Sequence, residues 1–307
     1  MPLEYVDLTL RDLPSLDRDK TVFFMSVSPI EVHGPHLPLG TDVMVAEEVR
    51  KRVQNELGES RPDLTLVNMP PLYCGSDALP VLGSISVQAG GLSSVLYDYA
   101  RALSRQGFKY LVILDNHGGP RHHMGIDAAA RRAWSKHRFH LIDPFIETYK
   151  RMIRHDPALL SMTGLKDGAC GDDADNHAGT NETSLMLAIY GEGREIPGLD
   201  QIPASLPSQL RGVPRLVDSV GAALHSLGAT HAGTDLKHLA QVLAWTGKKG
   251  FLPYMGAPSA ATREAGEAMF RAHVKITIYL LERALAGESG LPTPVLSSLS
   301  FLRRLPE

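Results

Sequence analysis

An α/β fold with a mainly parallel sheet, covered by helices on both faces, is predicted by two features of the chain. Short apolar segments alternate with helical patterns over the first 190 residues. The segment at residues 110–114, YLVIL, contains no polar position, which is typical of a strand buried on both faces of a parallel sheet. The chain has 307 residues, of which 43% are hydrophobic, so it can bury a sizeable core. We expect a single domain over residues 1–307.

The elements follow from hydrophobic periodicity and from turn residues. Strands are predicted at residues 21–27, 64–69, 110–114 and 139–142, with a short candidate at 84–87. Helices are predicted at residues 43–57, 92–106, 122–136, 145–154 and 182–190, and Asp42 is a suitable N-cap for the first of them. The Gly- and Pro-rich residues 192–215 are predicted to be irregular. Helices at 216–227, 236–246 and 260–286 follow, the last with room for one break, and residues 290–307 are expected to form a C-terminal arm.

Composition restricts the class of protein. The net charge of −3 does not favour a nucleic-acid partner. No apolar run reaches the roughly 18 residues that cross a membrane, and the first residues lack the pattern of a signal peptide, so we expect a cytoplasmic protein without a membrane partner. Two cysteines cannot form a disulfide scaffold. The 13 histidines outnumber the 9 tyrosines and the 8 phenylalanines, so their positions need inspection.

The first candidate site directly follows the strand predicted at 21–27. Glu31 and His33 are two residues apart, so both side chains can point to the same side of an extended segment. Asp42 follows nine residues later, where the loop can fold back. Carboxylate and imidazole ligands suit Zn²⁺ or Mn²⁺. The alternative is that these residues only satisfy the backbone of the loop.

Two further clusters stand at comparable places. Asn116, His117, Gly118 and Gly119 follow the most apolar strand, and the glycines allow a ligand to approach the backbone. The alternative is a tight strand-to-helix turn with an incidental histidine. His177 and Glu182 precede a helix, in a segment that begins with Asp172 and Asp173, and could instead form an acidic helix start. Because sites in such sheets form at the carboxyl ends of the strands, we expect the three clusters to meet around two metal ions.

Four segments of the chain resemble motifs of the creatininase (creatinine amidohydrolase) family. Residues 31–42, EVHGPHLPLGTD, resemble its E-x-H-G-x-H-L-P-x-x-T-D signature, and residues 114–119 resemble its N-G-H-G-G-N turn. Residues 177–184 resemble its H-A-G-x-x-E-T-S segment, and residues 255–266 its closing G-x-P-x-x-A-T-x-x-x-G motif. The resemblance spans residues 15–190 and 250–285, which leaves residues 192–249 as a divergent or inserted region.

The resemblance implies a three-layer α/β/α sandwich, a binuclear metal site and a homo-oligomer, commonly a hexamer. Residue by residue, it implies that Glu31, His33, Asp42 and His117 are metal ligands, with Asp42 bridging. The creatinine-cleaving members take a carboxylate from a position that Gly119 occupies here. The resemblance therefore argues against creatinine as the substrate and transfers the role of fifth ligand to Glu182.

The function that the resemblance implies is hydrolysis of a C–N bond in a small cyclic amide or formamide. Two divalent ions, Zn²⁺ and/or Mn²⁺, would activate a water, and Glu182 could take its proton. His177 would protonate the departing nitrogen or hold the tetrahedral oxygen. The predicted substrate contacts are Asn116, Gly118, Gly119, His122 and His123. The alternatives are a lactone or a cyclic ketone (keto-cyclitol) as the substrate of the same site, or an inactive metal-binding subunit.

Overall fold

The computed structural model describes residues 2–154, 156–164, 175–205, 209–289 and 292–304. Its sheet has the order β1-β3-β2-β5-β6, and β4 pairs with β2 beyond the end of β3; all of these pairs are parallel. The strands are Leu3–Glu4 (β1), Thr21–Ser28 (β2), Thr65–Asn68 (β3), Leu72–Tyr73 (β4), Tyr110–Leu114 (β5) and His140–Ile142 (β6). The predicted mainly parallel sheet is confirmed.

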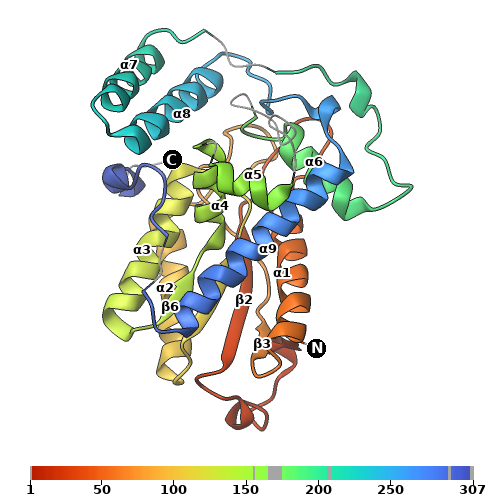
Figure 1. The fold of residues 1–307 in the computed structure, drawn as a ribbon, viewed down its shortest axis with the longest axis vertical. Coiled ribbons are helices and arrows are strands. Elements are labelled where there is room, and N and C mark those ends of the chain that lie inside the picture. The colour runs from red at the N-terminus through yellow and green to blue at the C-terminus, as the bar shows by residue number, and fades with distance from the viewer. Residues whose placement is uncertain (1, 155, 165–174, 206–208, 290–291, 305–307) are drawn as a thin grey trace.

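Helices cover both faces of the sheet. Along β2, Val22 and Phe24 point to one face, where they pack with α1 (Thr41–Ser60), α6 (Thr180–Tyr190) and α9 (Arg263–Leu285). Phe23 and Met25 point to the other face, where α2 (Ala89–Arg105) and α3 (Pro120–His137) pack. This alternation is the two-residue period of a strand that is buried on both faces. Two cores on either side of one sheet form the expected three-layer α/β/α sandwich (Figure 1).

Three local predictions are wrong. Gly40, not Asp42, is the N-cap of α1, because the helix already begins at Thr41. Asp42 therefore lies in the first turn of α1 and its carboxylate is not used for capping. The strand predicted at 84–87 is reduced to an isolated bridge between Ile30 and Ile85. The helix α9 has no break.

Most of the divergent region that the structure describes forms a helical hairpin. It consists of α7 (Val213–Ser226) and α8 (Thr230–Thr246), which Figure 1 shows at one end of the molecule, beyond the helices that cover the sheet. The two helices lie close together, since a Cβ added at Gly221 would be 2.8 Å from the Gly233 carbonyl oxygen. Arg154, next to α4 (Pro144–Ile153), donates to both carboxylate oxygens of Asp235 on α8 at 2.9–3.0 Å. The hairpin is thereby attached to the main body.

The described part of the C-terminal arm packs against its own chain. Val295 and Leu296 are buried and contact Met124 of α3, and the 3₁₀ segment Ser297–Arg304 (η5) lies against α2 and α3. The short helix Pro157–Thr163 (α5) contacts α9. Asp172 and Asp173 of the third cluster lie outside the described residues. Within the described ranges, none of the helices combines the length and the apolar character required to cross a membrane.

Candidate metal centre

Six side chains from four parts of the chain meet at the carboxyl end of the sheet. Glu31 and His33 belong to the loop after β2, Asp42 to the first turn of α1, and His117 to the turn after β5. The remaining two, His177 and Glu182, stand before and within the first turn of α6. Their ligand atoms form three overlapping groups, each within 4.8 Å: Glu31, Asp42 and His117; His33, Asp42 and Glu182; and Glu31, His33 and His177. The predicted convergence of the three clusters is therefore present.

The Asp42 carboxylate stands between two halves of this centre. Its Oδ1 lies 3.2 Å from His33 Nε2, and its Oδ2 lies 3.6 Å from His117 Nδ1. On the first side, Glu182 Oε2 is 3.7 Å from His33 Nε2. On the second side, Glu31 Oε2 is 2.9 Å from His117 Nδ1. This is the arrangement of two three-ligand sets that share one carboxylate.

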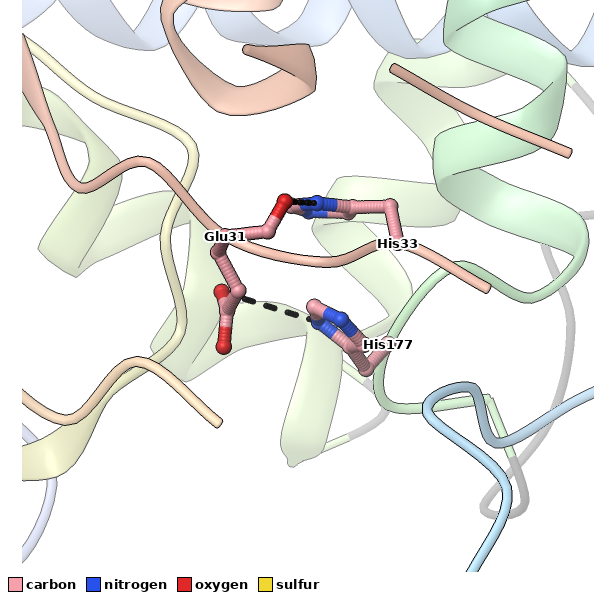
Figure 2. A group of neighbouring side chains, drawn as sticks. All are labelled: Glu31, His33 and His177. Carbon is pink, nitrogen blue, oxygen red and sulfur yellow. Dashed lines mark hydrogen bonds and ion pairs between the residues drawn. The ribbon is translucent and has the colours of Figure 1, made fainter. Parts of the chain in front are cut away.

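Backbone carbonyls orient all three imidazole rings. His33 Nδ1 donates to the Glu31 carbonyl at 3.0 Å, and His177 Nε2 donates to the Val32 carbonyl at 2.8 Å. His117 Nε2 donates to the Ser76 carbonyl at 2.9 Å. Figure 2 shows the Glu31 side chain directed toward His177 while its backbone carbonyl meets His33. Such partners leave the second ring nitrogen of each histidine free to bind a cation.

The surroundings of two buried carboxylate oxygens show whether the residues of the centre suit a metal ion. Glu31 Oε2 and Asp42 Oδ2 are inaccessible to solvent, and both face His117 Nδ1, at 2.9 and 3.6 Å. Buried carboxylate oxygens that are not balanced by a cation or a proton cost free energy. Both oxygens point to histidine nitrogens, and together they form the mixed nitrogen and oxygen set that Zn²⁺ and Mn²⁺ bind. The residues present therefore fit a pair of divalent cations.

The charges of the centre support this fit. Burial opposes ionisation of Glu31, but His117 and His177 outweigh it and lower the pKa of the carboxyl to about 2. Burial also disfavours a charged His33, yet Asp42 and Glu182 raise its pKa to about 10. The pKa of His117 is raised well above its ordinary value against the effect of burial, chiefly by Glu31. Without a bound cation, protons on these histidines balance the carboxylates, and metal binding would displace them.

The centre opens beside Glu182 and His177. Their side chains are 15% and 10% exposed, whereas those of the other four residues are at most 5% exposed. Burial lowers the pKa of His177 to about 4, so its imidazole is neutral at pH 7. Burial also raises the pKa of Glu182 to about 8, with Asp42 and Glu31 adding to the rise. The two predicted catalytic residues are thus the most exposed of the six.

The predicted substrate contacts separate into two groups. Asn116 lies in the centre, where its Nδ2 donates to Asp42 Oδ1 at 3.3 Å and to Glu182 Oε1 at 3.1 Å. Gly118 and Gly119 flank the same turn as His117. His122 and His123 lie behind His117, and both are buried. The structure therefore does not bring these two histidines to the opening.

The turn after β5 has no room for a carboxylate side chain at position 119. A Cβ added there would collide with His117 Nε2, and it would lie 2.7 Å from Asp77 Cβ and 2.9 Å from the Ser76 carbonyl oxygen. A longer side chain has no room in this conformation of the turn. In this conformation of the turn, position 119 cannot provide a carboxylate to the centre.

Sequence analysis missed the residues that surround the centre. Trp245 of α8 places its ring 5.8 Å from the His177 ring, centroid to centroid. Tyr149 of α4 lies against Gly118, and its hydroxyl is hydrogen-bonded to His238 of α8 at 2.8 Å. These residues come from segments without a recognisable motif, so no local signal in the sequence marks them. The divergent region supplies part of the wall of the site.

The fold and the site define a class of protein: an α/β/α sandwich whose strand ends carry paired histidines and carboxylates suited to divalent cations, as in metal-dependent hydrolases. The family model Creatininase, described as creatinine amidohydrolase, matches residues 6–281. The chain belongs to the creatininase family and is a hydrolase.

Two curated relatives illustrate the range of this family. The chain is 30% identical to the creatinine amidohydrolase of Pseudomonas putida over 199 residues, which cover 61% of this chain and 71% of the relative. It is 30% identical to the mycofactocin precursor peptide peptidase of Mycolicibacterium smegmatis over 274 residues, which cover 87% of each chain. The chain is therefore similar to two hydrolases whose names denote different substrates.

Solved structures confirm the fold. A putative creatinine amidohydrolase from Bacteroides fragilis superimposes with a TM-score of 0.61 at 22% identity, over 92% of this chain and 96% of that chain. A structure designated Creatininase Mn gives a TM-score of 0.60 at 22% identity, over 92% of this chain and 98% of that chain. The predicted α/β/α architecture is shared across almost the whole of these proteins.

Proposed function

We propose that this protein is a metal-dependent amidohydrolase that hydrolyses a C–N bond at a centre for two divalent cations. The observation that carries the proposal is the Asp42 carboxylate, which faces His33 with one oxygen and His117 with the other. Glu31, Asp42 and His117 would hold one cation, and His33, Asp42 and Glu182 the other. We propose Zn²⁺ and/or Mn²⁺, because one related structure is designated Creatininase Mn and another a Zn-Zn type creatininase.

The chemistry follows from the cations and from the residues at the opening. Bound divalent cations supply Lewis acidity, which polarises a carbonyl and makes water more acidic. Glu182 lies at the exposed edge of the centre, and its Oε2 is 3.9 Å from His177 Nδ1. His177 uses its Nε2 proton on the Val32 carbonyl, so Nδ1 presents a lone pair. His177 can therefore take a proton at Nδ1 and pass it to the departing nitrogen, which favours proton transfer over holding an oxyanion.

The substrate class is a small cyclic amide or a formamide. Creatinine is disfavoured, because the carboxylate of the creatinine-cleaving pattern is replaced by Gly119 and the turn has no room for it. A peptide amide is a second candidate, since the relative that matches 87% of the chain is named as a peptide peptidase. A lactone or a keto-cyclitol at the same centre would place the carbonyl in the same position, so only a substrate panel separates these classes.

Metal counting tests the centre directly. Glu31→Ala and His117→Ala should lose bound metal and hydrolytic activity, whereas the surface variants Glu56→Ala and His231→Ala should keep both. Metal content is measured by inductively coupled plasma mass spectrometry on purified protein. Activity is measured on creatinine, other cyclic amides, formamides, short peptides, lactones and keto-cyclitols. Full metal occupancy in both site variants would overturn the ligand assignment, and a metal-loaded protein inert toward the whole panel would favour an inactive metal-binding subunit.

A further inference from the structure

A second cluster of carboxylates and histidines lies behind the candidate metal centre. Asp115 directly follows β5, Asp143 directly follows β6, and His122 and His123 lie in the first turn of α3. One oxygen of Asp115, one nitrogen of His123 and one oxygen of Asp143 lie within 4.8 Å of one another. The side chains of all four residues are at most 3% exposed. None of them belongs to the six-residue centre.

The outer oxygen of each carboxylate is fully used by the fold. Asp115 Oδ1 accepts from the backbone N–H groups of Asn116 and His117, at 2.8 and 3.1 Å, and from the Ser28 hydroxyl. Asp143 Oδ1 accepts from the backbone N–H of Phe145 at 3.0 Å and caps α4. These bonds hold both carboxylates in place, and their inner oxygens are directed to the interior of the cluster.

The inner atoms lack the partners that their burial requires. Asp143 Oδ2 and both ring nitrogens of His123 have no hydrogen bond to any residue within the described ranges, and Asp115 Oδ2 faces only His122 Nε2, at 3.1 Å. The nearest approach of His123 Nδ1 to Asp143 Oδ2 is 3.6 Å, too long for a hydrogen bond. Phe145 and Tyr149 stack beside the His123 ring, with centroids 5.5 and 5.8 Å away, and exclude water from it. Unpaired polar atoms in such surroundings are costly.

We propose that Asp115, His123 and Asp143 form a third divalent cation site, separate from the two-cation centre. Two carboxylate oxygens and one imidazole nitrogen are a ligand set for Zn²⁺ or Mn²⁺. Ligand atoms about 2.1 Å from one ion are at most about 4.2 Å apart, so small side-chain rotations close the observed arrangement around a cation. A cation at this position binds the inner carboxylate oxygens and a His123 nitrogen at the same time. A proton on His123 Nδ1 cannot replace it, because Asp143 Oδ2 is 3.6 Å away, too far for a hydrogen bond.

A cation at this site would have a structural role and not a catalytic one. It has no exposed ligand, and its three residues come from the ends of β5 and β6 and the start of α3. A cation would therefore join three elements at one point. Because Asp115 also accepts the backbone N–H of His117, the site holds the strand end that carries a proposed ligand of the two-cation centre. His122 Nε2, 3.1 Å from Asp115 Oδ2, supports that carboxylate from the other side.

Metal stoichiometry and anomalous diffraction test the site in the full-length protein. After Zn²⁺ or Mn²⁺ loading and dialysis, the wild-type chain should hold one equivalent more than Asp143→Asn or His123→Phe. The matched control Asp127→Asn removes an α3 carboxylate that pairs with Arg131, and it should hold the wild-type number of ions. An anomalous peak between Asp115, His123 and Asp143 is expected in wild-type crystals.

The outcomes separate this site from the two-cation centre. Equal metal counts in wild type and both variants, or anomalous peaks confined to the Glu31 and His33 centre, would overturn the third site while leaving the proposed function in place. Absence of anomalous peaks at that centre, with a peak retained beside Asp143, would overturn the two-cation centre and leave the third site in place. If Asp143→Asn does not fold, His123→Phe preserves an aromatic ring beside Phe145 and supplies the same count, and the wild-type anomalous map decides independently of any variant.

Discussion

Replacement of Gly119 by alanine is the sharpest test of how the turn after β5 positions His117. The backbone at Gly119 has φ −60° and ψ 121°, so alanine is compatible with its conformation and only the space is restricted. The added Cβ would collide with His117 Nε2 and would lie 2.7 Å from Asp77 Cβ. The substitution therefore forces the imidazole ring or the turn to move.

The size of the effect follows from these contacts. Carbon atoms in contact are ordinarily about 3.5–4.0 Å apart, so the groups must separate by about 1 Å. The moved ring loses the bond from Nε2 to the Ser76 carbonyl, which directs Nδ1 to Glu31 and Asp42. Loss of such an orienting bond weakens metal binding by about 10–100-fold, and a displacement of 1 Å lowers activity by about 100-fold.

The assay measures metal affinity by competition with a chelator, and kcat/KM on the best substrate of the panel. Gly91→Ala is the matched control, because a Cβ at that position of α2 meets no atom within 4 Å. It should keep wild-type affinity and activity. Wild-type metal affinity together with unchanged kcat/KM in Gly119→Ala would refute the reasoning.

Three further outcomes are expected. Burial lowers the pKa of His273 to about 4, below the value of about 6.5 in the unfolded chain, so the unfolded state binds more protons as the pH falls. His273 should therefore cost the wild type about 2 kcal/mol of unfolding free energy between about pH 7.5 and pH 5. A denaturant series that shows the same loss in His273→Phe would contradict this. Trp245→Ala should lower kcat/KM by about tenfold with metal content unchanged, because its ring borders His177, and unaltered kinetics would argue against that wall. Asp235→Asn should destabilise the fold by about 2 kcal/mol, because the partly buried Arg154 loses its anionic partner, and a melting temperature equal to that of wild type would exclude this.

Elements with a strong local pattern could be predicted from the chain. The strand Tyr110–Leu114 was predicted residue for residue, since five consecutive apolar side chains are typical of a strand buried on both faces. The strands Leu3–Glu4 and Leu72–Tyr73 have two residues each, too few to show a period, and sequence analysis missed them. The helix α8 begins at Thr230, six residues before its predicted start, because Gly233 weakens the helical pattern but packs closely against α7.

The site could be predicted to the extent that its residues cluster along the chain. Glu31, His33 and Asp42 fall within twelve residues, and His117 follows another strand, so the rule that sites form at strand ends brings them together. The walls could not be found in this way, since Trp245 reaches the centre through the docking of the α7–α8 hairpin.

The sequence by itself determined the parallel sheet, its flanking helices and the candidate ligands, because periodicity and contiguous motifs act over a few residues. Only the tertiary structure decided which oxygen of Asp42 faces which histidine, and that Glu182 and His177 border the opening. It also placed His123, which was predicted to contact the substrate, beside Asp115 and Asp143. These are distances between side chains from different elements, and packing of the whole chain sets them.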